Sequence, residues 1–267
     1  MSIAFIAVIS ALLYLAGAGV QLASSLQGRT GTNRSVLIIA FFALGTHVFL
    51  VWQNVLGGVG VDFGFFALLS LVFLAVNLAC LLALARRPLQ NLLAVLFPLS
   101  AVAVLVSTLG PDTQQGQAHI PVGVALHVGS SIVAYSILTL AAIQAALLAA
   151  QDWQLRRHQF SGVLRALPPL QLMESMLFEL LWVGVVALTL SIATGFVFME
   201  DIFAQHLVHK TVLSMAAWVL FSLLLAGHHL LGWRSQTAVR LTVSGFTLLM
   251  LAFFGSKLVL ELVLERS

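Results

Sequence analysis

Charged residues are scarce in this sequence: 12 Lys and Arg and 9 Asp and Glu make up 8% of its 267 residues. Soluble domains carry about 25% charged residues. Hydrophobic residues reach 61% here, and the mean hydropathy is +1.08. A soluble globular fold is therefore excluded, and an integral membrane protein is expected. Although the formal net charge is +3, the basic residues are scattered between apolar runs, so no nucleic-acid partner is expected.

Cysteine is almost absent, since Cys80 is the only one. One cysteine cannot build a disulfide framework, a CxxC redox pair or a thiolate metal site within one chain. The CxxCH motif that attaches haem covalently is also missing. Cys80 lies inside an apolar run and is interpreted as a packing residue.

Long uncharged runs separated by polar or Gly/Pro punctuation predict about eight transmembrane helices. The expected spans are 2–24, 36–56, 63–85, 89–109, 121–150, 174–199, 206–232 and 237–263. Pro168 and Pro169 must interrupt any helix that precedes the sixth span. No repeat of fixed period is found, so the fold class is all-α, a polytopic helical bundle forming a single integral membrane domain over 1–267.

The basic residues predict the orientation, because short loops rich in Lys and Arg stay in the cytoplasm. Nine of the twelve follow odd-numbered spans: Arg29, Arg34, Arg86, Arg87, Arg156, Arg157, Arg165, Arg234 and Arg240. The alternate loops carry acidic residues such as Asp62, Asp112 and Glu200. Both termini are therefore expected to be periplasmic.

Six of the eight histidines lie within predicted spans. His206, the first residue of span seven, is interpreted as an interfacial residue, and the five candidate site residues are His47, His127, His209, His228 and His229. Histidine in a bilayer needs a partner, which is a ligand or a hydrogen bond to another helix, and both interpretations stay open for each residue. HExxH and ExxH motifs are absent, and no acidic residue lies at mid-membrane depth. A zinc or di-iron site is therefore disfavoured, whereas haem needs only neutral imidazoles and apolar walls. His127 and His209, each about one turn from the outer end of its span, are expected to face a common cavity.

Three segments carry a recognisable pattern: "LHVGSSIVAYSILTLAA", "HKTVLSMAAWVLFSLLLAGHHLLGWRS" and "FFGSKLVLEL". They resemble the cytochrome c assembly family, within its short bacterial inner-membrane branch of HemX-like and YpjD-like proteins. The resemblance implies a haem b held non-covalently in the membrane, with His47 as one iron ligand and His228, or its neighbour His229, as the other. It also implies that His127 is the first ligand of an outer haem site.

The sequence departs from the ligating members of the family at two places. Their tryptophan-rich loop is replaced by "FVFMEDIFAQHLVHKT", which contains no Trp, and the last span carries Lys257 and no histidine. Haem presentation for covalent attachment is therefore not expected.

The leading functional hypothesis is a non-enzymatic haem-binding or haem-handling protein of the bacterial inner membrane, with the lipid bilayer, haem and other cytochrome c assembly or haem-synthesis proteins as partners. The alternative is a membrane accessory or regulatory protein that acts on haem-synthesis enzymes or is associated with ion efflux. In that case the histidines are packing or metal-sensing groups. Transport ranks third, because Glu174, Glu179 and Glu261 lie toward span ends and offer no central coupling-ion site.

Overall fold

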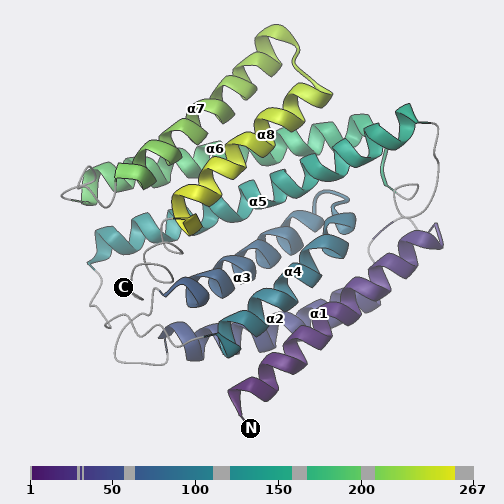
Figure 1. Cartoon of the computed structure of the whole chain (residues 1–267). Helices are drawn as coiled ribbons and strands as arrows, with labels where there is room; N and C mark the ends of the chain where they lie inside the picture. The colour runs from purple at the N-terminus through teal and green to yellow at the C-terminus, as the bar shows by residue number, and fades with distance from the viewer. Residues whose placement is uncertain are drawn as a thin grey trace. The chain divides into compact units, whose positions relative to one another are not determined.

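The computed structural model describes residues 2–28, 31, 33–56, 64–110, 121–157, 167–199 and 208–255. Every regular element in these ranges is a helix (Figure 1). The long helices are α1 (Ile3–Leu26), α2 (Arg34–Val51), α3 (Phe65–Leu84), α4 (Gln90–Leu109), α5 (Val122–Arg156), α6 (Leu170–Phe198), α7 (Val208–Leu231) and α8 (Ser235–Met250). Two π-helical turns, Trp52–Leu56 and Leu251–Gly255, extend α2 and α8. Within the described ranges, eight helices are long and apolar enough to cross a membrane, which confirms the predicted all-α membrane fold.

The helices divide into two compact units, α1 to α4 and α5 to α8. In the first unit α1 packs against α2 and α4, and α3 packs against α4. Its core includes Tyr14, Leu96 and Phe97, and Cys80 of α3 is fully buried. Phe97 lies so close to Gly17 that a side chain at 17 would collide with its ring. The first unit is therefore built around a close approach of α1 to α4.

In the second unit α5 and α6 form a long pair, while α7 packs on α6 and α8 packs on α5 and α7 (Figure 1). Interhelical hydrogen bonds add to the apolar contacts: the Tyr135 hydroxyl donates to the Leu249 carbonyl at 2.9 Å, and the Trp218 indole N–H donates to Thr189 Oγ1 at 2.9 Å. Such bonds stabilise helix pairs where lipid supplies no hydrophobic driving force. The expectation of one domain over 1–267 stays a prediction.

The helix ends follow local backbone signals. Asn33 caps α2 by accepting a hydrogen bond from the Ser35 N–H at 3.0 Å, and the chain turns after α1 at Gly28, whose φ is 69°. As expected, the Pro168–Pro169 pair precedes a helix start, because α6 begins at Leu170. Among the spans whose two ends are described, α5 departs most from expectation, because it continues to Arg156 instead of ending at 150 and is 35 residues long. The expected end of the last span, 263, lies outside the described residues.

Candidate functional site: a histidine cavity at the end of α7

The sequence around "GHHLLGWR" forms the end of α7 and the turn that follows. The chain reverses at Gly232, whose φ of 66° is readily adopted only by glycine. This reversal folds the next residue back over the helix, so that the Trp233 N–H donates to the Gly227 carbonyl at 3.1 Å. The Trp233 indole then packs directly on Gly227, where any side chain would collide with it. Both glycines are therefore required by the geometry of this turn.

The turn also fixes the ring of His228. Its Nδ1 lies 2.8 Å from the Trp233 carbonyl oxygen. A carbonyl can only accept, so Nδ1 carries the proton and Nε2 is left with its lone pair. On its face the ring stacks on Phe178 of α6, with centroids 3.6 Å apart and planes at 18°. His228 is thus held in one tautomer and one orientation, as metal-ligating histidines usually are.

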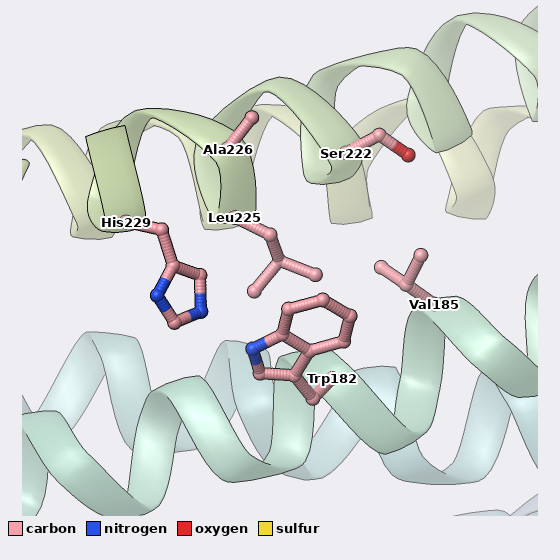
Figure 2. A pocket seen from close by; sticks show the side chains of 6 residues that line it. All are labelled: Trp182, Val185, Ser222, Leu225, Ala226 and His229. Atoms are coloured by element: carbon pink, nitrogen blue, oxygen red, sulfur yellow. The ribbon is translucent and has the colours of Figure 1, made fainter. Parts of the chain in front are cut away.

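Two adjoining cavities of about 340 and 220 Å³ lie between the start of α6 and the end of α7. They share Trp182 and His229 as lining residues, and His228 and Phe178 line the larger one. Figure 2 shows the His229 ring of α7 beside the Trp182 indole of α6; their centroids are 5.8 Å apart. The larger cavity falls within the range of small-molecule sites, which is about 300–1,000 Å³.

Charged groups also line the larger cavity: Glu174, Glu179 and Arg234. From the sequence, Glu174 and Glu179 are expected toward a span end but are not brought together with these histidines. The carboxylates were missed because they were assessed by depth alone. Consecutive spans cross the membrane in opposite directions, so the start of span six lies at the same side as the end of span seven. The sequence alone therefore contained the information that Glu174 and Glu179 lie at the level of His228. Within the described ranges no three His, Cys, Asp or Glu side chains are arranged to hold a metal ion.

His127 lies in a polar seam between α5 and α6. Its Nδ1 donates to the Ser191 carbonyl at 2.8 Å, so that Nε2 again keeps its lone pair. Ser131 and Ser191 are joined at 2.7 Å in the same seam, and Gly195 leaves the space that the ring occupies. His209, on the first turn of α7, is exposed. The common cavity of His127 and His209 stays a prediction.

His47 lies in the first unit and is fully buried. Its Nδ1 is 3.0 Å from the Tyr14 hydroxyl of α1, and its Nε2 is 3.0 Å from Ser70 Oγ of α3. The ring also meets Tyr14 edge-on, at a centroid distance of 5.7 Å. Both ring nitrogens therefore have partners, whereas His127 and His228 each have a partner on Nδ1 alone among the described residues.

Comparison with known proteins identifies the family. The pattern described as "Cytochrome C assembly protein" matches residues 35–264. The chain belongs to the cytochrome c assembly protein family. It is 31% identical over 259 residues to "Inner membrane protein YpjD" of Escherichia coli K12, an alignment that covers 95% of this chain and 98% of the relative. It is also 31% identical over 196 residues to an "Uncharacterized 28.8 kDa protein in nifR3-like 5'region" of Azospirillum brasilense, covering 73% and 71% of the two chains. No solved structure matches the chain.

Membership of the cytochrome c assembly protein family confirms the resemblance found in the sequence. The predicted location, a multi-pass protein of the bacterial inner membrane, is confirmed by the eight membrane-length helices in the described ranges together with the relative named an inner membrane protein. His206, Lys257 and residues 200–207 of the Trp-free loop lie outside the described residues, as does His158.

Haem, which the resemblance implied, can be tested against the chemistry at each histidine. At His228 the donor set fits, because a neutral imidazole keeps Nε2 for iron and Phe178 and Trp182 offer aromatic walls. Arg234 lines the same cavity and could pair with a propionate. At His47 the fit requires the ring to give up its hydrogen bond to Ser70 or to Tyr14.

Proposed function

We propose that this member of the cytochrome c assembly protein family is a non-enzymatic haem-binding or haem-handling protein, which holds haem b non-covalently in the membrane and has other cytochrome c assembly or haem-synthesis proteins as partners. His228 is the ligand at the cavity between α6 and α7. Haem would supply an iron centre that accepts a neutral imidazole. The residues of this chain determine where haem binds and how it is oriented.

The observation that carries the proposal is the hydrogen bond from His228 Nδ1 to the Trp233 carbonyl, at 2.8 Å. This bond selects the tautomer with a free Nε2 and fixes the orientation of the ring, which is what an iron ligand needs. No hydrogen bond of this kind is found for His229 within the described ranges, and its side chain is exposed. His228 is therefore the better candidate of the pair, with His229 as the fallback.

A second axial ligand has to come from another helix. His228 and His229 are neighbours on α7, with ring centroids 5.6 Å apart, and adjacent residues of one helix cannot reach opposite faces of a single iron. His47 as an iron ligand stays a prediction from the family resemblance. His127 and His209 remain the proposed residues of an outer site.

The test is the absorption spectrum of protein purified in detergent from cells with ample haem. We expect a Soret band in the unaltered protein and its loss, or a shift to a five-coordinate form, in His228→Ala. The matched control is His229→Ala, which removes the adjacent imidazole and should keep the band. In His228→Gly, added imidazole should restore the spectrum, because it fills the space that the missing ring leaves.

A native spectrum in His228→Ala would show that His228 is not the ligand, and His229→Ala would then be the next variant to test. Haem binding itself would be refuted by unaltered protein without any Soret absorbance, or by native spectra in both His47→Ala and His228→Ala. The histidines would then be hydrogen-bonding residues of the helix bundle. A membrane accessory or regulatory role would become the leading hypothesis.

A further inference from the structure

A separate cavity of about 210 Å³ lies between the end of α5 and the start of α8. Its rim is polar and carries Asp152, Arg156, Ser235, Gln236 and Arg240. Its remaining walls are apolar, from Leu148, Ala149, Trp153 and Val239. None of these residues belongs to the histidine cavity, so the site is independent of the proposed haem site.

The charge of the rim favours an anion. Asp152 is its only acidic residue, and Oδ2 of Asp152 already accepts hydrogen bonds from Arg156 Nε at 3.1 Å and from Gln236 Nε2 at 3.2 Å. The Arg156 side chain is 65% exposed while that of Asp152 is 16% exposed, so the outer part of the guanidinium stays accessible. Arg240 has no ion-pair partner among the described residues. The rim thus offers two guanidinium groups and one compensated carboxylate.

The position of the cavity relative to the bilayer favours an amphipathic ligand. At 1.5 Å per residue α5 is about 52 Å long, whereas the hydrocarbon core of a bilayer is about 30 Å thick. The last turns of α5 therefore reach the headgroup region, and the predicted topology puts them on the cytoplasmic side. Arg157 lies over the Trp153 ring at 4.4 Å from its centroid, an arrangement suited to the membrane interface.

We infer that the α5–α8 cavity binds the headgroup of an anionic phospholipid. Arg156 and Arg240 contact the phosphate, and the acyl chains follow the apolar wall beside Leu148 and Val239. Basic pockets between helices on the cytoplasmic side are suited to such headgroups. A free phosphate ion would use the same two arginines but would gain nothing from the apolar wall, and for this reason a lipid is the inferred ligand.

The experiment measures lipids bound to the full-length protein by native mass spectrometry, with phosphatidylglycerol or phosphatidylethanolamine added to the detergent solution. We expect the anionic lipid to bind more tightly than the zwitterionic one. Arg240→Gln should weaken phosphatidylglycerol binding about fivefold, the effect of one basic residue at a membrane surface. Arg86→Gln is the matched control, because Arg86 is an exposed arginine on the same predicted side, at the end of α3.

Thermal unfolding of both variants separates binding from folding, and Arg240→Gln should unfold at the temperature of the Arg86→Gln control. An excess of inorganic phosphate should leave phosphatidylglycerol bound. Equal binding of the two lipids, equal losses in the two variants, or displacement by phosphate would each overturn the inference. The last result would assign the rim to free anions.

Discussion

At the scale of single residues, the histidines differ in which ring nitrogens are already engaged. His228 and His127 each donate from Nδ1 to a backbone carbonyl, whereas both nitrogens of His47 meet side-chain hydroxyls on other helices. A carbonyl partner on Nδ1 orients a ring whose Nε2 can bind a metal. The Tyr14 and Ser70 hydroxyls, on the two sides of the His47 ring, instead join α1, α2 and α3. His47 therefore has a structural role whether or not it also binds iron.

The substitution His47→Ala removes the partner that the Tyr14 and Ser70 hydroxyls have on this ring. We expect it to lower the free energy of unfolding of haem-free protein by about 1–3 kcal/mol, since buried polar groups are left unpaired. Denaturant unfolding in detergent measures the change. The control is Thr46→Val, because the Thr46 hydroxyl bonds only to carbonyls of its own helix, Phe42 and Ala43.

Ser70→Ala distinguishes the two roles of His47. It frees Nε2 without removing the imidazole. If His47 coordinates iron, the Soret band should be retained in Ser70→Ala and should be lost, or shifted toward a five-coordinate form, in His47→Ala. If haem-loaded His47→Ala keeps a native spectrum, His47 is not an iron ligand and only its structural role stands.

At the scale of elements, the end of α7 acts as one piece in which two glycines, Trp233 and His228 depend on one another. We expect Gly227→Ala to displace the Trp233 indole and with it the carbonyl that orients His228. Haem affinity should fall about 10- to 100-fold, as for other changes behind a metal ligand. A Soret titration measures it.

The matched control is Gly129→Ala in α5, where the same added methyl group meets no atom within 4 Å. Gly129→Ala should bind haem as the unaltered protein does. Equal affinities in the two alanine variants would show that the turn does not position His228.

The helices themselves were largely predictable, because uncharged runs of about 20 residues have few alternatives. Their ends were less so. A helix can continue where its residues are good helix formers, and Gln151, Gln154 and Leu155 carry α5 beyond the apolar run. Glu174, Glu179 and His228 line one cavity. Predicting this requires the pairing of α6 with α7 as well as the depth of each residue along its span. The tautomer of His228 depends on a turn whose hydrogen bonds no sequence pattern specifies.

At the scale of the whole molecule, the orientation in the membrane stays a prediction from the nine basic residues that follow odd-numbered spans. Reporter enzymes fused after Arg87 and after Asp112 flank the fourth span. We expect the first to be active as a cytoplasmic fusion and the second as a periplasmic one. Identical or reversed results would show that the assignment of the termini to the periplasm is wrong.

The rate at which Cys80 reacts with a thiol reagent measures how often the folded protein opens around it. It is the only thiol of the chain and is fully buried in α3, inside the α1–α4 unit. A maleimide can therefore react only when this unit opens, and the labelling rate reports that opening without any substitution. Labelling with and without haem would therefore reveal whether haem binding also stabilises the α1–α4 unit, as it should if His47 is an iron ligand.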